Sequence, residues 1–366
     1  MVYQKGEALP AVSIVMSLYN EESVIAEKLQ TILASNYPAD KLNVWIGSDC
    51  SDDQTHAIVS AWIADYPNFH FCPFAERRGK PSVINDLVAF AQQENKTPEN
   101  HILVITDANV MFTPDTITGL VKHFKNPAIG LVDSNIMPPS ATTVLANGIA
   151  AGEQVYISGE VAIKHLEGKA WGRTMGPLGG CYALRAKWFE PVPAQRLVDD
   201  FYIAMKVFEK GGLAINELQA VCYETVPNSM SEEFRRKTRI SSGNFANLAT
   251  FKHLLLPLNS SLSFAFLSHK VLRWLGPFFI LIAGFSLSGL AYYYNNLFYW
   301  ILFVLMIVGL FGIPILDWVF KKMKLNITSI RYITYFNAMN LALFNGFIKY
   351  LKGGQNGIWQ PTKRDS

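Results

Sequence analysis

Two long runs without a charged residue constrain this chain more than any other feature of its sequence. No Asp, Glu, Lys or Arg occurs from Trp274 to Tyr294, and none occurs from Leu297 to Leu316. Each run has about the 20 residues that a helix needs to cross the hydrocarbon core of a bilayer. Because only Asn295 and Asn296 separate the runs, the sequence predicts a helical hairpin in a membrane. Two buried core helices are the alternative.

The remaining composition excludes several classes of protein. The 366 residues include 32 Lys+Arg and 29 Asp+Glu, a balance too even for a nucleic-acid-binding surface. Half of the positions are apolar and only 17% are charged, which excludes a disordered chain. The first ten residues contain no apolar run of the signal-peptide type, and the four cysteines lie far apart. We therefore expect a cytosolic domain with reduced thiols.

The change in charge density after Lys252 marks the expected domain boundary. We expect residues 1–252 to form a cytosolic domain and residues 253–366 to form a membrane region. The expected parts of that region are an interfacial helix at 254–272, transmembrane helices at 274–294 and 297–319, a third membrane-associated helix at 331–350 and a tail at 351–366. Three asparagines interrupt the third helix, so we expect it to lie along the inner interface. Lys and Arg residues flank both ends of the hairpin, which predicts a multi-pass protein of the cytoplasmic (inner) membrane with its catalytic domain in the cytoplasm.

Short β-rich runs alternate with amphipathic helices in the first half of the chain. The predicted strands are 11–17, 43–48, 69–72, 101–106 and 129–132, and helices are predicted between them, for example at 81–92 and 115–124. Such an alternation is typical of an α/β fold with a mostly parallel sheet that helices cover on both faces. Ligands bind beyond the carboxyl ends of the strands in these sheets.

Polar residues follow three of the predicted strands. They are Tyr19 to Glu21 after the first, Ser48 to Asp53 around the end of the second, and Asp107 with Asn109 after the fourth. Asp107 and Asn109 are two positions apart, so both side chains can face one way and offer oxygen atoms to Mg²⁺ or Mn²⁺. A helix cap or Asx turn is the alternative. The chain has neither G-x-G-x-x-G nor a P-loop sequence.

Six segments follow one another in the order and spacing of a known set of motifs. They are Ser13–Glu22, Ser48–Thr55, Gly79–Asn85, Thr106–Asn109, Gly176–Arg185 and Val198–Phe201. Through them the chain resembles the membrane-associated family 2 glycosyltransferases, which have the GT-A fold and use nucleotide-diphosphate sugars. Ser17 stands where a Pro is usual, and Cys50 replaces a Gly. The resemblance covers roughly residues 10–250 and implies a Rossmann-like nucleotide-sugar-binding domain, with a UDP-sugar favoured as donor.

The resemblance also implies roles for individual residues. The donor would be bound by Tyr19, Asn20, Glu21, Asp49, Lys80, Asp107 and Arg239, the divalent metal by Asp107 and Asn109, and the acceptor by Gly179, Gly180 and Asp199. Asp200 would be the general base, because it opens a predicted helix at 199–210 whose free amides favour an ionised carboxylate. Two ordinary capping acids are the alternative at this position.

The implied activity is inverting transfer of a hexosyl or N-acetylhexosaminyl group to a lipid-linked or nascent-glycan acceptor at the membrane. A processive polysaccharide synthase is a second hypothesis. Of the Q-x-x-R-W motif of such synthases only Arg239 is kept, since Arg236 and Ile240 take the Gln and Trp positions. The segment Trp359 to Arg364 resembles their W-x-x-T-x-R loop. A catalytically silent nucleotide-sugar-binding scaffold in a membrane assembly is the third hypothesis.

Overall fold

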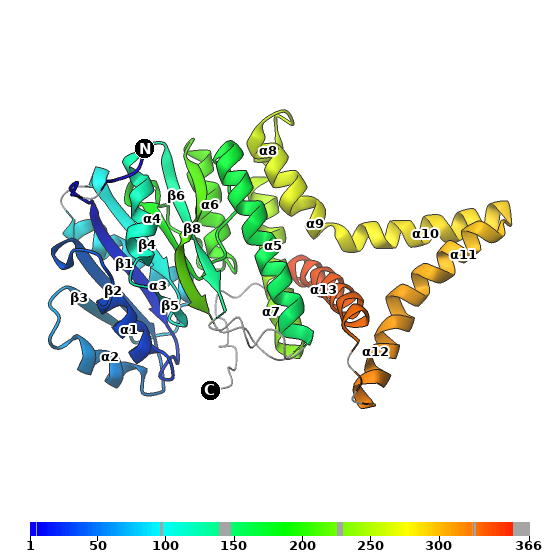
Figure 1. The fold of residues 1–366 in the computed structure, drawn as a ribbon, viewed down its shortest axis with the longest axis horizontal. Coiled ribbons are helices and arrows are strands. Elements are labelled where there is room, and N and C mark those ends of the chain that lie inside the picture. Colours follow the sequence, from blue (N-terminus) through cyan, green and yellow to red (C-terminus); the bar gives the residue numbers. More distant parts are fainter. Residues whose placement is uncertain are drawn as a thin grey trace.

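The computed structural model describes residues 1–4, 6–95, 98–138, 148–224, 230–323, 325 and 327–353. It shows an α/β body from which a helical region extends to one side (Figure 1). The segment 359–364, which resembles the W-x-x-T-x-R loop, lies outside the described residues.

One eight-stranded sheet forms the centre of the body, in the order β3-β2-β1-β4-β7-β6-β8-β5. The strands are β1 (Ala11–Leu18), β2 (Leu42–Asp49), β3 (Phe69–Phe74), β4 (His101–Thr106), β5 (Val110–Phe112), β6 (Ile129–Met137), β7 (Cys181–Arg185) and β8 (Leu213–Glu224). The neighbours β3, β2, β1 and β4 run parallel, whereas β7 runs antiparallel to β4 and β6, and β5 antiparallel to β8. The five predicted strands are confirmed. The strands β5, β7 and β8 were not predicted from the sequence.

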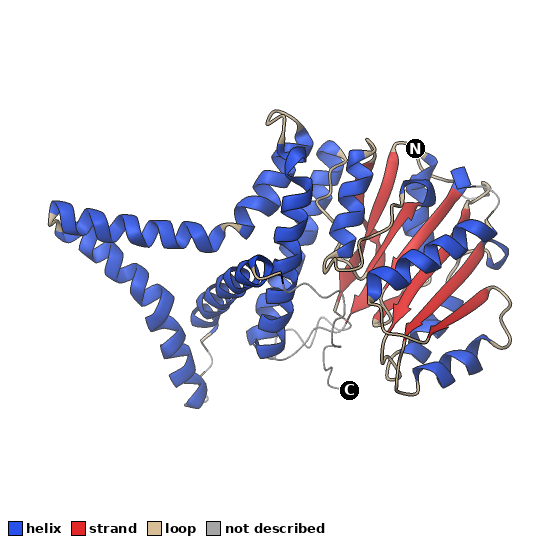
Figure 2. Cartoon of the chain, turned by 180° about the vertical axis from the view of Figure 1, so that it is seen from behind, coloured by secondary structure: helices blue, strands red, loops and turns tan. Residues whose placement is uncertain are grey.

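Helices cover both faces of this sheet (Figure 2). One core contains α1 (Ile25–Leu33), α2 (Thr55–Ile63) and α4 (Thr116–Val121), and the other contains α3 (Lys80–Glu94) and α6 (Asp199–Glu209). Alternate residues of β1 pack into the two cores: Ile14 and Met16 lie in the first, and Val15 lies in the second. A strand buried on both faces has no polar side, which explains the continuous apolar runs in the sequence.

Three longer helices stand at the edge of the body that faces the helical region. They are α5 (Gly148–Trp171), α7 (Met230–Phe251) and α13 (Thr328–Leu351). The helices α7 and α13 cross closely at Gly346, where a Cβ atom would lie 2.3 Å from the Cβ of Ser241. The Ser241 hydroxyl donates a hydrogen bond to the Leu343 carbonyl at 2.8 Å. This crossing fixes α13 against the body.

The segment 254–272, predicted as one interfacial helix, is divided in the structure. A 3₁₀ turn (Lys252–Leu255) ends before Pro257, and helix resumes at α8 (Ser261–Ala265), a π-helical segment (Phe266–Val271) and α9 (Leu272–Trp274). The Ser260 hydroxyl caps the new start by accepting a hydrogen bond from the Ser263 amide at 3.0 Å. We call residues 261–274 the elbow.

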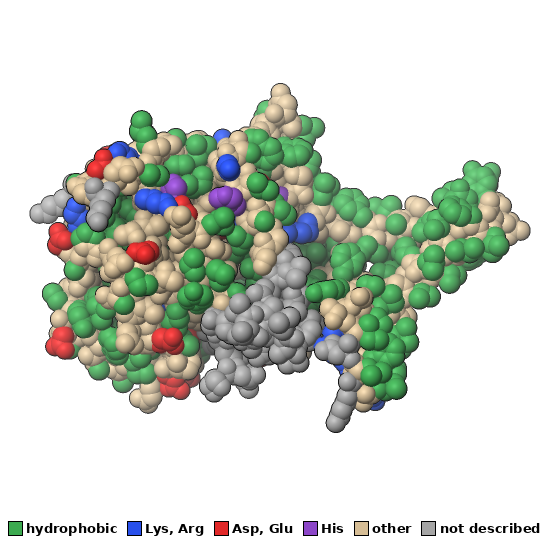
Figure 3. Space-filling view, viewed as in Figure 1, with side chains coloured by type: hydrophobic (Ala, Val, Ile, Leu, Met, Phe, Trp, Pro, Cys, Tyr) green, Lys and Arg blue, Asp and Glu red, His purple; other side chains and the backbone are tan. Residues whose placement is uncertain are grey.

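The two charge-free runs form a pair of helices that project away from the body (Figure 1). One is α10 (Gly276–Tyr294), and the other comprises α11 (Leu297–Ile307), a π-helical segment (Val308–Gly312) and α12 (Ile313–Lys322). Both have the length and apolar composition of membrane spans, and only 11% and 0% of their most apolar windows are buried. Figure 3 shows their surface covered with hydrophobic side chains. We call residues 276–322 the hairpin.

Candidate active site

The carboxyl ends of β1 and β4 meet the start of β7 at one edge of the sheet. The Asp107 amide donates to the Gly180 carbonyl at 2.9 Å, which holds the turn after β4 against the loop before β7. A cavity of about 860 Å³ opens here. Nine of the predicted site residues line it: Glu21, Lys80, Asp107, Asn109, Gly179, Gly180, Asp199, Asp200 and Arg239. Tyr19, Asn20 and Asp49 are not among the lining residues.

Asp49 is buried at the end of β2 and holds the loop that leads to Lys80. Its Oδ1 atom accepts a hydrogen bond from the Arg78 amide at 2.7 Å, and its Oδ2 atom accepts one from the Gly79 amide at 2.9 Å. Because Lys80 is the first residue of α3, these bonds position its side chain. A contact between Asp49 and the nucleotide stays a prediction.

Tyr19 and Asn20 belong to a second cluster beside the cavity. The Arg77 guanidinium stacks 3.5 Å from the centre of the Tyr19 ring, a partner that the sequence analysis missed. Asn20 donates to Asp52 through its side-chain amide at 2.5 Å and accepts from the Asp52 backbone amide at 3.0 Å. Asn20 and Cys50 have left-handed backbones, with φ of 53° and 60°, and a Gly at position 50 would adopt this conformation without strain.

Lys80 lies between the turn after β4 and the start of α6. Its Nζ atom lies 2.6 Å from Asp107 Oδ1 and 3.8 Å from Asp199 Oδ2. Burial opposes the charged form of Lys80, but the nearby carboxylates outweigh burial and raise its pKa. The side chain is therefore a permanent cation in the cavity wall.

Oxygen atoms that suit a divalent metal gather at the end of β4. The Asn109 side-chain amide donates to Glu224 Oε1 at 2.9 Å, and its Oδ1 atom remains an acceptor. Glu224 ends β8, which the sequence analysis did not predict, so this carboxylate was missed. In the described parts of the chain, no group of three or more His, Cys, Asp or Glu side chains is arranged to hold a metal. Asp107, Asn109 and Glu224 fit an ion such as Mg²⁺, which keeps waters and substrate phosphates as further ligands.

Of the two acids at the start of α6, Asp200 faces the glycine loop, and Asp199 lies toward Lys80. Neither caps the helix with its side chain, because the N-cap residue is Val198. The Asp200 Oδ1 atom accepts a hydrogen bond from the Phe201 amide at 2.7 Å. Gly179 has φ of 93°, and a Cβ atom there would lie 2.6 Å from Asp200 Oδ2. Only glycine fits at position 179, for both reasons.

The surroundings of Asp200 suit a general base at neutral pH. Burial raises its pKa to about 7, and the charge of Asp199 acts in the same direction. Lys80 and Lys164 lower it in part. A carboxylate whose pKa lies near the working pH can accept a proton efficiently.

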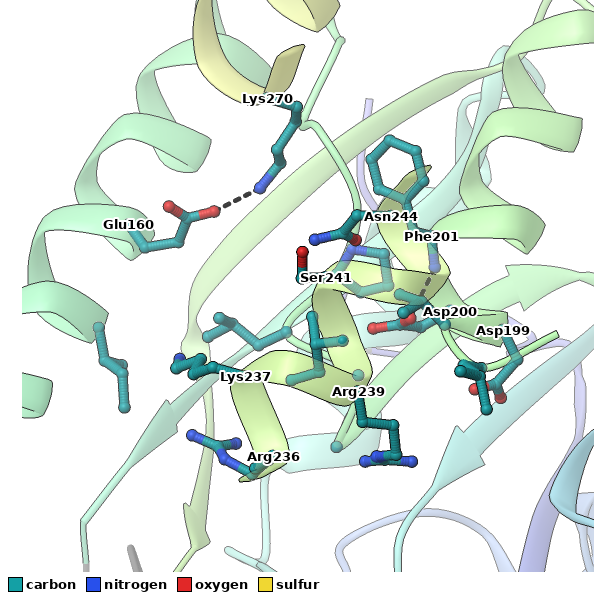
Figure 4. A pocket seen from close by; sticks show the side chains of 18 of the residues that line it. Glu160, Asp199, Asp200, Phe201, Arg236, Lys237, Arg239, Ser241, Asn244 and Lys270 are labelled. Atoms are coloured by element: carbon teal, nitrogen blue, oxygen red, sulfur yellow. Dashed lines mark hydrogen bonds and ion pairs between the residues drawn. The ribbon is translucent and has the colours of Figure 1, made fainter. Parts of the chain in front are cut away.

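The basic segment of α7 forms a wall of the same cavity. Arg239 lies in the electric field of Asp199, Asp107 and Asp200, and burial lowers its pKa, yet an arginine stays charged in this range. Arg236 and Ile240, at the positions of the synthase Gln and Trp, also line the cavity. Figure 4 shows Arg236, Lys237 and Arg239 on this helix, with Asp199 and Asp200 beside them.

Further lining residues come from segments for which the sequence analysis proposed no site. They are Glu160 and Lys164 on α5, and Lys270, Arg273 and Trp274 in the elbow. These side chains reach the cavity because α5 and the elbow pack together through the ion pairs of buried Glu160 with Lys270 and Arg273, at 2.5 and 2.7 Å.

A mixed α/β sheet with a polar cavity at its carboxyl edge is the arrangement expected of the GT-A fold. The family model described as glycosyl transferase family 2 matches residues 13–189, which is just under half of the chain.

Relatives of known name agree with this class. The chain is 28% identical over 123 residues to the beta-monoglucosyldiacylglycerol synthase of Synechocystis sp., covering 33% of this chain and 24% of the relative. It is 21% identical over 252 residues to the poly-beta-1,6-N-acetyl-D-glucosamine synthase of Staphylococcus epidermidis, covering 66% of this chain and 57% of the relative. The chain thus spans from about a quarter to just over half of the length of these two relatives.

A solved structure shares the fold over nearly the whole chain. It is the mannosyltransferase PcManGT from Pyrobaculum calidifontis in complex with GDP-Man and Mn²⁺, with a TM-score of 0.65 and 22% identity. The match covers 94% of this chain and 88% of the neighbour. The GT-A fold predicted from the sequence is therefore confirmed.

Proposed function

We propose that this protein is an inverting glycosyltransferase that moves a sugar from a nucleotide-diphosphate sugar to an acceptor presented at a membrane. The observation that carries the proposal is that one cavity contains both halves of the chemistry. Lys80 and Asp107 lie on its donor wall, and Asp200, with a pKa of about 7, lies on its acceptor wall.

The donor wall would bind and neutralise the diphosphate. Lys80 and Arg239 bring positive charge to the leaving group, which stabilises it as the glycosidic bond to the nucleotide breaks. Asp107 and Asn109, with Glu224 beside them, would hold a divalent ion, and such an ion supplies further positive charge to the diphosphate. We assign the base and ribose to the cluster of Tyr19 and Asn20, and Glu21 and Asp49 to the same subsite.

The acceptor wall would activate the attacking hydroxyl. Asp200 accepts the hydroxyl proton while the hydroxyl oxygen bonds to the anomeric carbon, and the bonding electron pair leaves with the nucleotide diphosphate. Gly179 and Gly180 let the acceptor approach the backbone, and Asp199 would hydrogen-bond to it. A single displacement inverts the anomeric centre and needs no protein nucleophile.

We also propose that the hairpin spans the cytoplasmic membrane. Lys270 and Arg273 precede it, whereas Lys321 and Lys322 end it, so both ends belong on the cytoplasmic side. Its helices of 19 and 26 residues are long enough for about 30 Å of hydrocarbon. The packing of α13 on α7 supports its position along the inner interface, next to the body.

Transfer from a panel of donors tests the proposal. The full chain in detergent micelles is incubated with membrane-lipid extract, Mn²⁺ or Mg²⁺, and radiolabelled UDP- and GDP-sugars, and labelled lipid is counted. The panel includes both bases because the UDP preference has no support from the neighbour, which was solved with GDP-Man. We expect one donor to label a lipid-soluble product, and Asp200→Asn to remove the label. Donor binding without transfer would favour the scaffold, and a long polymer would favour the synthase.

A further inference from the structure

The cavity extends beyond the catalytic acids, and its two ends differ in chemistry. Asp107, Asp199 and Asp200 lie at one end. The other end is lined by side chains of α10 and α13, among them Ile280, Phe336, Met339 and Leu343. Because α10 is the first helix of the hairpin, this apolar end opens toward the region that we place in lipid.

Basic side chains from two further elements also line the cavity. Arg236 and Lys237 come from α7, and Lys270 and Arg273 come from the elbow. In Figure 4, Lys237, Arg236 and Lys270 lie on one side of the view, and Asp199 and Asp200 lie on the other. Cations contributed by two separate elements therefore share one cavity with the apolar end and with Asp200.

The elbow cations are crowded around one carboxylate. Glu160 lies 2.5 Å from Lys270 and 2.7 Å from Arg273. Burial lowers the pKa of Lys270 to about 8 despite the charge of Glu160, and the positive charges of Arg273 and Lys164 contribute to that lowering. A second negative charge in the cavity would stabilise this group of cations.

These two features together select one kind of ligand. Lysine and arginine bind phosphate through charge-assisted hydrogen bonds, and an aliphatic and aromatic lining favours a hydrocarbon chain. Glu233 pairs with both Arg236 and Lys237, at 2.8 and 3.2 Å, just as Glu160 pairs with both Lys270 and Arg273. A phosphate would add negative charge beside these two groups, and a neutral lipid would not. A glycan would place polar hydroxyl groups against Ile280, Met339 and Leu343.

We propose that the acceptor is a membrane lipid that carries a phosphate group. Its hydrocarbon chain lies between α10 and α13, its phosphate lies between α7 and the elbow, and its acceptor hydroxyl lies at Asp200. This inference rests on the proposed function and names the substrate class of the same site.

Binding of three probes to the full chain in a neutral detergent tests the proposal. The probes are dodecyl phosphate, dodecanol and inorganic phosphate, measured by titration calorimetry. We expect dodecyl phosphate to bind at least tenfold more tightly than either of the others. Equal binding of dodecanol would show a site for a neutral chain, equal binding of inorganic phosphate would show a free-anion site, and either result overturns the proposal. So does no binding of dodecyl phosphate.

Variants locate the two parts of the ligand. Lys237→Met and Arg273→Met should each weaken dodecyl phosphate binding about tenfold or more and leave dodecanol binding unchanged. Leu343→Trp, which fills the apolar end, should weaken both alkyl probes. Lys187→Met is the matched control, because this exposed lysine pairs with Glu99 on the body surface. Equal affinities in Lys187→Met and Lys237→Met would contradict the assignment, provided that all variants melt as wild type does.

Donor binding, measured on the same preparations, separates this inference from the proposed function. A protein that binds no nucleotide sugar with Mn²⁺ has lost the proposed function, whatever the lipid result. A protein that binds the donor but does not prefer dodecyl phosphate to dodecanol loses only the lipid inference.

Discussion

The body and the hairpin are both built from long apolar runs, but they place these side chains in opposite surroundings. Ile14, Leu103 and Val104 in the sheet are 0% exposed, whereas Phe285 and Tyr292 in the hairpin are 76% and 85% exposed. Water penalises apolar surface in proportion to its area, so the hairpin requires a different solvent from the body. Apolar composition therefore predicts burial, and the fold decides whether protein or lipid provides it.

The prediction with the largest expected effect concerns catalysis, which we assign to the body and not to the hairpin. Asp200→Asn removes the proton acceptor, so transfer should fall about 100-fold or more, and donor affinity should stay near wild type. Initial rates and donor titrations measure both. Asp40→Asn, on the exposed surface, is the control. A variant that keeps a tenth of the wild-type rate would refute the assignment.

The second test compares stability between the two regions directly. Leu103→Ala leaves a cavity in the sheet and should lower the free energy of unfolding by about 2–5 kcal/mol. Leu305→Ala, at a position that is 61% exposed, should change it by less than about 0.5 kcal/mol in detergent. Denaturant titrations of the two variants under the same conditions measure both free energies of unfolding. Equal losses would mean that the hairpin is packed against protein.

The third test concerns the metal on the donor wall. Asp107→Ala removes a proposed ligand and should weaken donor binding at least tenfold in Mn²⁺, with a smaller effect in EDTA. Calorimetry under both conditions measures the difference. Wild-type activity that chelators leave undiminished would exclude the proposed metal role.

The fourth test uses pH to sharpen the assignment of Asp200. Because the base must be ionised, a pKa of about 7 predicts transfer about tenfold below its plateau near pH 6. Asp199, Lys80, Lys164 and Arg239 surround this carboxyl. Asp199→Asn removes a like charge and should lower the pKa of Asp200. The fall of kcat/KM on the acid side of the pH profile should then move to lower pH, whatever happens to the maximal value. A fall that does not move would assign the titration to another group.

The smallest expected effect is in a loop of the body. Cys50→Gly should stabilise the fold by up to about 1 kcal/mol, because Cys50 has a left-handed backbone that glycine adopts without strain. Cys72→Gly, in the extended strand β3, should destabilise it instead. Thermal melts of the two variants should shift in opposite directions.

Features encoded over short stretches of sequence were predictable. Strand and helix periodicity, the order of the six motifs and the charge-free runs each depend on neighbouring residues. They predicted the fold class, the strands β1, β2, β3, β4 and β6, and nine of the residues that line the cavity. The antiparallel strand β7 was missed because a five-residue strand after a glycine loop has too little pattern of its own.

The tertiary structure alone decided how distant segments complete the site. Glu224 meets Asn109 across 115 positions, and Lys270 meets Glu160 across 110. It also showed that both oxygens of Asp49 hold the loop before Lys80. Such contacts depend on which strands become neighbours in the sheet and which helices pack on its edge. These choices minimise the free energy of the whole chain, so no local pattern of residues records them.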